Sequence, residues 1–435
     1  MRVDLPYRNG MLLTLLFALA FLFAAPAMAQ DEEEVPEVVL EAYSTGFYRP
    51  GILLTSQSDS TLGRGNAAVG ELFVERVRFA LVWSGYVNLF TPEDISNVGP
   101  RETPGSDAPE MELRISLQPD TEKNAVKALI QLAELEGSPF YAGTISFSLE
   151  NALRKGDVAT EEVLRQITGM TAPFRSRIVA VEQRPENVKE LILLAYDGGS
   201  RWELTRDNSI ALSPSWSPDG RKIVFTSFRG GEDAELWIAD LDKRRIVQLL
   251  DRTGTDAACE WSPTGDWIIF AGSSGNVTHL YLIRPDGSGL RRLTRGNWID
   301  TSPSWSPDGR RIVFMSDRSG SPQIYRMDID GTNLKRLTYE GGYNADPSWS
   351  PAGDRIAYAR LGDRGFQLRS MDPMGDVDIP LTDEYGDHLD PSWSPDGMKI
   401  TYNYRDKVWV MSADGTLRRP LLSDGLMPDW SPIPK

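Results

Sequence analysis

The 435-residue sequence is poor in the residues on which metal sites and nucleophilic sites depend. Its one cysteine, Cys259, excludes an internal disulfide and a cysteine zinc cluster, and we interpret it as a small buried hydrophobic residue. Its two histidines, His279 and His388, have no further zinc ligands beside them, so we expect both to be satisfied residues of the fold. A Gly-x-Ser-x-Gly motif and a phosphate-binding glycine loop are also absent. We therefore predict no catalysis, no cofactor and no bound metal.

Long hydrophobic runs are lacking after the first thirty residues. There, Arg2 and Arg8 precede an apolar run from Met11 to Ala25, which is shorter than the about 20 residues that a membrane-spanning helix needs. The following "APAMAQ" is typical of a processing site, so we predict a signal peptide over residues 1–29 and an exported protein that does not span the membrane. Its removal takes away two arginines and Asp4, which changes the formal charge from −16 to −17. Such a charge disfavours nucleic acid as a partner.

One motif, Trp-Ser-Pro, recurs along the last half of the chain. Successive copies are separated by 45, 44, 44, 44 and 37 residues, a period typical of four-stranded propeller blades. After each of the first five copies come a tight turn, two apolar runs and a short "RRLT"-like segment, which predict three further strands. We expect each indole to pack between successive blades and to find a hydrogen-bond partner. The tryptophans are Trp216, Trp261, Trp305, Trp349, Trp393 and Trp430.

The two ends of the repeat region complete each other. Arg177–Gln183, Lys189–Gly198 and Arg201–Thr205 match the second, third and fourth strands of a unit, but no first strand precedes them. The terminal "MPDWSPIPK" supplies a first strand and nothing more. Joining the ends would remove the open edge of a linear stack. The predicted fold is therefore mainly β, with a six-bladed β-propeller over residues 173–435 whose last blade is closed by both chain ends.

Residues 30–172 lack this period and predict a small α/β domain. Helical spacing of apolar residues indicates a helix over Asn66–Gly85, and "ATEEVLRQITG" indicates a second over Ala159–Gly169, with Thr160 as its N-cap. Residues 123–137 are ambiguous, and the alternation of apolar side chains favours a strand. Further strands are expected over residues 35–44, 50–57, 86–90, 111–120 and 141–149.

The loops that enter the first strands should surround the mouth of the central channel. Acidic and small polar residues are frequent there, and diverse loops on a rigid scaffold are typical of partner binding. An equally open alternative is that these acids only hold turns through Asx-type hydrogen bonds. The aspartates expected to ring one opening are Asp256, Asp300, Asp346 and Asp390.

The chain resembles the TolB family, the periplasmic component of the Tol-Pal cell-envelope system of Gram-negative bacteria. The resemblance covers nearly the whole chain after the signal peptide. Its most specific parts are the junction "TEEVLRQITGMTAPFRSRIVAV" (Thr160–Val181), the ordering of the "WSPDG" repeats and the closure at "DWSP". It implies a periplasmic, monomeric scaffold without catalysis that supports outer-membrane integrity and cell division.

The resemblance also implies two partners. The peptidoglycan-associated lipoprotein Pal would bind at the propeller mouth, and TolA of the inner-membrane complex would contact a mobile N-terminal segment, Glu37–Ser44. The Pal-facing positions that it implies are chiefly Thr255, Ala258 and Thr301, with Asn344 and His388 as neighbours in the other mouth loops.

Two alternatives stay open. The first is an exported propeller enzyme with its active site in the channel, and the second is a TolB-like sensor outside the Tol system. The acids Asp372, Asp376 and Asp378 lack the spacing of a calcium loop, and we interpret them as a solvated loop.

Overall fold

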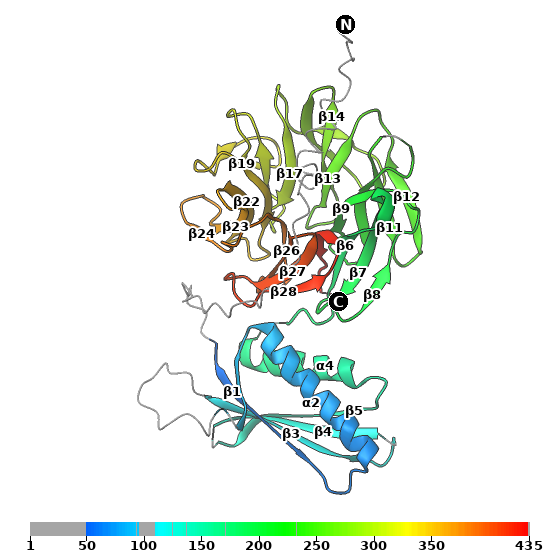
Figure 1. Ribbon diagram of the computed structural model, residues 1–435, viewed down its shortest axis with the longest axis vertical. Coiled ribbons are helices and arrows are strands. Elements are labelled where there is room, and N and C mark those ends of the chain that lie inside the picture. The colour runs from blue at the N-terminus through cyan, green and yellow to red at the C-terminus, as the bar shows by residue number, and fades with distance from the viewer. Residues whose placement is uncertain are drawn as a thin grey trace, which may run out of the picture. The chain divides into compact units, whose positions relative to one another are not determined.

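The structure is a computed structural model that describes residues 49–433, apart from residues 93, 95–108, 124, 136, 170 and 232. The signal peptide, the strand expected over residues 35–44 and the segment Glu37–Ser44 lie outside the described residues. The chain forms two units, each with its own sheets, and the domain boundaries expected from the sequence stay predictions (Figure 1). Within the described ranges, no helix combines the length and the apolarity needed to cross a membrane.

The first unit is a five-stranded sheet of order β2-β1-β3-β4-β5, with two helices against one face (Figure 1). Alternate residues of β3 and β4, such as Leu113 and Ile130, are buried, and Phe73 stacks on Phe147 at 4.2 Å between ring centroids. The ambiguous stretch is therefore a strand, as the alternation predicts. The strands are β1 (Gly51–Ser58), β2 (Asn88–Phe90), β3 (Met111–Asp120), β4 (Ala125–Glu134) and β5 (Pro139–Phe147), and the helices are α2 (Arg64–Ser84) and α4 (Ala152–Thr168).

Helix α4 corrects one expectation. It begins at Ala152, so Thr160 is not an N-cap: it is fully buried inside the helix, where its hydroxyl donates to the carbonyl of Gly156 at 2.9 Å. Gly156 lies against α2, since an added Cβ there would come within 2.8 Å of Arg76 Cγ. The ion pair of Arg76 Nε with Asp157, 2.6 Å, fixes the same contact. A glycine disfavours a helix in an isolated chain, so the residue types do not predict the first turns of α4. The packing of Gly156 against α2 stabilises these turns.

The second unit consists of six antiparallel four-stranded sheets. The first strands are β9 (Ala211–Trp216), β13 (Asp256–Trp261), β17 (Asp300–Trp305), β21 (Asn344–Trp349), β25 (His388–Trp393) and β29 (Gly425–Trp430). The second strands are β10 (Lys222–Ser227), β14 (Ile268–Ser274), β18 (Arg311–Ser316), β22 (Ile356–Gly362), β26 (Lys399–Tyr404) and β6 (Arg177–Gln183). The third strands are β11 (Glu235–Asp240), β15 (Val277–Ile283), β19 (Gln323–Asp328), β23 (Gly365–Met371), β27 (Lys407–Ser412) and β7 (Lys189–Ala195). The fourth strands are β12 (Arg245–Leu250), β16 (Arg291–Arg292), β20 (Lys335–Arg336), β24 (Asp378–Pro380), β28 (Arg419–Leu422) and β8 (Arg201–Glu203), and a short 3-10 helix, η1 (Pro185–Asn187), joins β6 to β7.

The last sheet is built from both ends of the propeller sequence. Its order is β29-β6-β7-β8, and Trp430 lies opposite Ile178 in the antiparallel pairing of β29 with β6. The amide of Ser431 donates to the carbonyl of Arg177 at 2.8 Å, which continues the pairing past the strand. The predicted closure by both chain ends is confirmed.

The turn that follows each of the first five repeat tryptophans is explained by its residue types. In Ser217-Pro-Asp-Gly220, the amide of Gly220 donates to the carbonyl of Ser217 at 2.8 Å, and Gly220 has a φ of 68°. The Ser217 hydroxyl donates to Asp219 at 2.6 Å and accepts the amide of Lys222 at 2.9 Å. Proline presets the turn and glycine takes the positive φ, so the chain reverses directly into the second strand.

The tryptophans pack between neighbouring sheets, as predicted. Trp305 of β17, for example, belongs to one buried cluster with Ile269 and Leu282 of the preceding sheet. The expected indole hydrogen bond forms for Trp216, which donates to the carbonyl of Asp429 at 3.2 Å, and for Trp393. It was wrong for three others: in the described chain the buried indole nitrogens of Trp261, Trp305 and Trp349 have no partner. Burial of the ring therefore contributes more to the stability of these contacts between sheets than a hydrogen bond from the indole nitrogen does.

Candidate functional site

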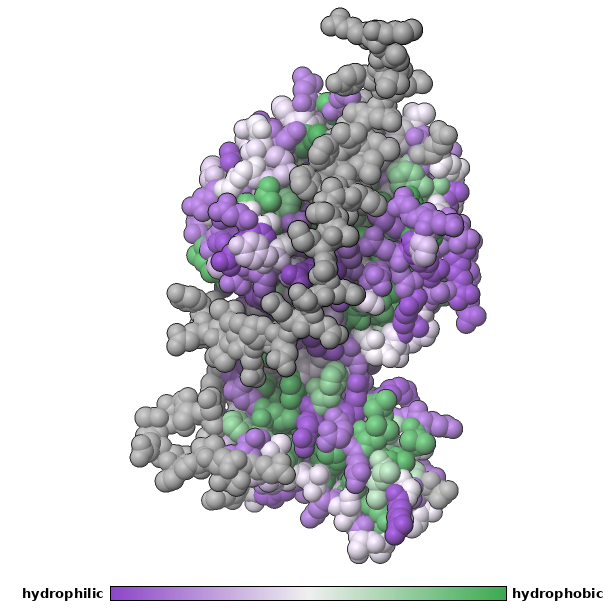
Figure 2. Space-filling view, in the orientation of Figure 1, coloured by the Kyte–Doolittle hydropathy of each residue, from purple (hydrophilic) through white to green (hydrophobic). Residues whose placement is uncertain are grey.

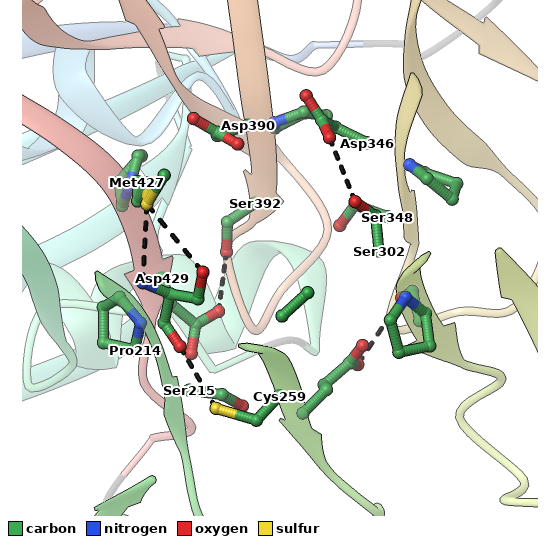
Figure 3. A pocket seen from close by; sticks show the side chains of 18 residues that line it. Pro214, Ser215, Cys259, Ser302, Asp346, Ser348, Asp390, Ser392, Met427 and Asp429 are labelled. Atoms are coloured by element: carbon green, nitrogen blue, oxygen red, sulfur yellow. Dashed lines mark hydrogen bonds between the residues drawn. The ribbon is translucent and has the colours of Figure 1, made fainter. Parts of the chain in front are cut away.

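The six first strands surround a channel with a cavity volume of about 170 Å³ (Figure 3). It is lined by the third, fourth and fifth residues of these strands. They are Ser213, Pro214, Ser215, Ala258, Cys259, Glu260, Ser302, Pro303, Ser304, Asp346, Pro347, Ser348, Asp390, Pro391, Ser392, Met427, Pro428 and Asp429.

A bulge in each first strand turns these residues toward the channel. The third residue has a φ between 46° and 51° in all six strands, although none of them is glycine, and the register with the second strand shifts at the same place. Such bulges re-aim side chains. The fourth residue is proline in five strands, and the exception is Cys259, which is buried as predicted and whose Sγ donates to the carbonyl of Ser213 at 3.3 Å.

The fifth residues tie each sheet to the next. Three serines accept the backbone amide of the following sheet's tryptophan on their side chains: Ser215 from Trp261 at 3.2 Å, Ser304 from Trp349 at 3.1 Å, and Ser392 from Trp430 at 3.1 Å. At Ser348, the backbone carbonyl accepts the indole nitrogen of Trp393 at 3.1 Å. Where the repeat replaces serine by an acid, the acid takes over the bond. Glu260 accepts from Trp305 at 3.2 Å, and Asp429 accepts from Trp216 at 2.8 Å. The bonds of Ser392 and Asp429 join β29 to the sheets on its two sides, so contacts between a side chain and the backbone link every pair of neighbouring sheets around the ring.

Four carboxyl groups face the channel, and burial raises the pKa of each. Asp346 and Asp390 lie beside each other in neighbouring strands, so the charge of Asp346 raises the pKa of Asp390 further (Figure 3). Burial raises the pKa of Glu260 well above its usual value and that of Asp429 to about 6. Over the described ranges, no three His, Cys, Asp or Glu side chains lie close enough together to hold a metal ion.

A model of the TolB beta propeller domain matches residues 164–434, which is more than half of the chain. The chain belongs to the TolB beta-propeller family. It is 39% identical over 142 residues to the Tol-Pal system protein TolB of Anaeromyxobacter dehalogenans strain 2CP-C, a match that covers 33% of this chain and 32% of that protein. It is 35% identical over 141 residues to a TolB homolog of Chlorobium luteolum, which covers 32% of this chain and 31% of that protein. The matched stretches thus span about a third of the curated relatives.

The fold likeness extends further than the sequence likeness. The crystal structure of TolB from Acinetobacter baumannii superposes with a TM-score of 0.72 over 88% of this chain and 97% of that one, at 23% identity. The TolB resemblance seen in the sequence and the predicted six-bladed fold are therefore confirmed.

The expected ring of four aspartates at one opening of this TolB-family propeller was wrong. Asp346 and Asp390 are third residues and line the channel, but Asp256 and Asp300 are first residues and do not. Both are buried against an arginine: Arg252 Nε lies 2.8 Å from Asp256, and Arg318 Nη2 lies 2.7 Å from Asp300. The bulge in each first strand places the third residues in the channel and the first residues away from it. The residue types of these segments do not predict the bulge.

The other residues predicted at the mouth also fall into channel residues and residues outside the channel. Ala258 lines the channel, whereas Asn344 and His388 are buried first residues. Asn344 donates to Gln323 Oε1 at 3.0 Å, and His388 stacks on Tyr404 at 4.2 Å. Thr255 and Thr301 are half-buried beside the first residues of β13 and β17, at the mouth end of these strands.

Two smaller expectations have different outcomes. His388 is satisfied, with Nδ1 3.3 Å from the carbonyl of Phe366, but the expectation for His279 was wrong, since neither ring nitrogen of this buried side chain has a partner among the described residues. Asp372 does organise a loop, because it accepts the amides of Met374, Asp376 and Val377. Asp378, by contrast, belongs to an ion-pair group with Arg360 and Arg369.

Sequence reasoning missed Glu260 and Asp429 as channel residues. The signal was present, since both replace a serine that precedes the tryptophan in the other four copies of the repeat. It also missed two tyrosines in the mouth loops, Tyr339 and Tyr385, which are each 70% exposed.

Proposed function

We propose that the chain is a periplasmic, non-catalytic scaffold of the Tol-Pal system, whose propeller mouth binds a Pal-like outer-membrane lipoprotein in support of envelope integrity and cell division. Family membership supports this proposal, because curated relatives carry the name of that system. The predicted signal peptide supports export. The observation that carries the proposal is the closed ring of six sheets. Hydrogen bonds join each sheet to the next, including the sheet that both chain ends build, and the ring therefore gives the mouth loops a rigid support.

The mouth offers anchors suited to a protein partner. Tyr339 and Tyr385 lie in the loops that enter β21 and β25, and each ring carries an arginine at its face: Arg336 at 4.8 Å and Arg364 at 5.4 Å. Tyrosine and arginine are enriched among the residues that dominate binding energy at protein interfaces. Elsewhere on the propeller face seen in Figure 2, hydrophilic side chains predominate and hydrophobic ones are scattered.

Substitution at the mouth tests the proposal. We expect Thr301→Arg and Thr255→Arg to abolish retention of the cognate Pal-like lipoprotein in a pull-down with purified proteins, because a long charged side chain would separate the two surfaces. Thr264→Arg is the matched control: Thr264 is exposed in the turn after β13, at the opposite end of the strand from Thr255. Asp300→Ala is unsuitable, because it would leave Arg318 without its buried partner.

Tyrosine variants extend the same assay. Tyr339→Ala with Tyr385→Ala should weaken binding about tenfold or more, as expected for loss of aromatic anchors. The control is Trp202→Ala on the outermost strand β8, a half-exposed ring that also carries an arginine, Arg177, at 5.6 Å. Unchanged binding in all mouth variants would remove the mouth as the interface.

We also propose that the N-terminal segment Glu37–Ser44 contacts a TolA-like inner-membrane protein. A chain without residues 37–44 should then lose the TolA-like partner in a pull-down and keep the lipoprotein. Loss of both partners, or of neither, would contradict this separation of the two contacts.

A further inference from the structure

A second hollow lies on the sheet β17–β20, at the end away from the loop that enters β17. Two turns form it, the one between β17 and β18 and the one between β19 and β20. Its volume is about 590 Å³, within the range of small-molecule sites. The lining residues are Asp308, Gly309, Arg310, Arg311, Arg326, Asp328, Ile329, Asp330 and Asn333.

Arg326 breaks the propeller repeat at this place. It lies opposite Val313 in the pairing of β18 with β19. The corresponding residues of the other sheets are Ile238 opposite Val224, Leu282 opposite Ile269, and Ser370 opposite Ala357. Three of the other sheets therefore form without an arginine at this position.

The arginines of the hollow form few ion pairs with its aspartates in the part of the chain that the structure describes. Arg326 Nη1 donates to the carbonyl of Pro373 at 2.5 Å, and in the described chain its guanidinium forms no ion pair with a carboxylate. Arg311 lies over the Trp349 ring at 5.8 Å, and its carboxylate contact, Asp308, is 4.0 Å away. Burial, and then the like charge of Arg311, lower the pKa of Arg326, and the smaller opposing effects of Asp328 and Asp372 do not cancel this shift.

The aspartates of the hollow are engaged in their own turns. Asp308 accepts the hydroxyl of Ser306 at 2.5 Å and the amide of Arg310 at 3.1 Å. Asp330 accepts the amide and the hydroxyl of Thr332 at 2.9 and 2.6 Å, and Asp328 accepts Asn333 Nδ2 at 2.6 Å. These bonds fix the carboxylates, whereas Nε and Nη2 of Arg326 donate to no other described residue and can donate to an incoming acceptor.

We propose that this hollow is a binding site for a small molecule that carries a carboxylate or phosphate group, held between Arg311 and Arg326. A guanidinium presents its donors in a planar fork that matches both kinds of oxyanion. In the sheet β9–β12, the equivalent turn has Arg221 paired with Asp242 at 3.6 Å across the same two turns. The site is independent of the proposed partner surface at the mouth.

Titration calorimetry with inorganic phosphate and with citrate tests the site on the purified chain, at constant ionic strength set by sodium chloride. We expect saturable binding of at least one probe at one site per chain, and a dissociation constant that rises about tenfold or more in Arg326→Ile. Isoleucine is the residue of the sheet β9–β12, so this variant should keep its unfolding midpoint. Arg221→Gln is the matched control and should bind like the unaltered chain.

The two probes also distinguish the source of the oxyanion. Saturation by phosphate alone assigns a phosphate ligand, saturation by citrate alone assigns a carboxylate ligand, and both outcomes support the site. Absence of saturation by either probe overturns the proposal, as does equal affinity in Arg326→Ile. Loss of partner binding at the mouth would leave these outcomes unaffected, so the two proposals fail separately.

Discussion

Trp430→Ala should lower the free energy of unfolding of the propeller by about 3–5 kcal/mol, the usual cost of deleting a buried aromatic ring. Trp430 is 5% exposed, and its amide donates to Ser392 of the neighbouring sheet. The substitution removes packing from β29, which joins its own sheet by antiparallel pairing with β6 although the two strands lie at opposite ends of the propeller sequence. In thermal unfolding followed by circular dichroism, the midpoint should fall by about 10 °C.

Trp202→Ala is the control for this prediction. Trp202 belongs to the same sheet but is 49% exposed, so its loss should cost roughly 0.5 kcal/mol or less. A chain that ends at Asp424 and so lacks β29 should lose its cooperative transition, because the edge of β6 is then open. Equal losses for the two tryptophans, or a cooperative transition of the shortened chain, would show that closure by β29 does not stabilise the ring.

The fold was predictable because the residues of the repeat determine the conformation of the chain close to their own positions. Proline and glycine after each of the first five tryptophans specify a turn, and the missing first strand before Arg177 specifies where the end of the chain must pair. The start of α4 was not predictable in this way, since it depends on the contact of Gly156 with another helix. Tertiary packing overrides helix propensity there.

The candidate site was less predictable than the fold. A positive φ at Ala258, Asp346 or Met427 is unusual for such residues, so no residue type announces the bulge that decides which side chains face the channel. The sequence therefore placed Asp256 and Asp346 together, although the structure separates them. The two acids that replace serine, Glu260 and Asp429, could have been found by comparing the repeats residue by residue.

Asp429→Asn should stabilise the chain at pH 7.5 by on the order of 2 kcal/mol and leave it nearly unchanged at pH 4. Burial raises the pKa of Asp429 from 3.8 to about 6. A carboxyl group whose pKa is raised by folding binds its proton more tightly in the folded state, so the chain loses stability as the pH rises from near 4 to about 6. Asparagine stays neutral and can keep both contacts, because its carbonyl accepts the Trp216 amide and its amide donates to Ser392.

The measurement is urea unfolding of both chains from pH 4 to pH 7.5, analysed as the difference between them, so that groups that titrate alike in both chains cancel. The charge of Asp429 also raises the pKa of Glu260, and loss of this repulsion adds to the expected stabilisation. Asp286→Asn is the control with the opposite sign: hydrogen bonds from the side chain and amide of Ser288 lower the pKa of exposed Asp286, so this variant should be the less stable chain at neutral pH and converge with the unaltered chain in acid. A stability difference for Asp429→Asn that does not change between pH 4 and pH 7.5 would mean that Asp429 keeps an ordinary pKa. Water in the channel would then solvate its four carboxylates, and these groups would destabilise the ring less than their burial indicates.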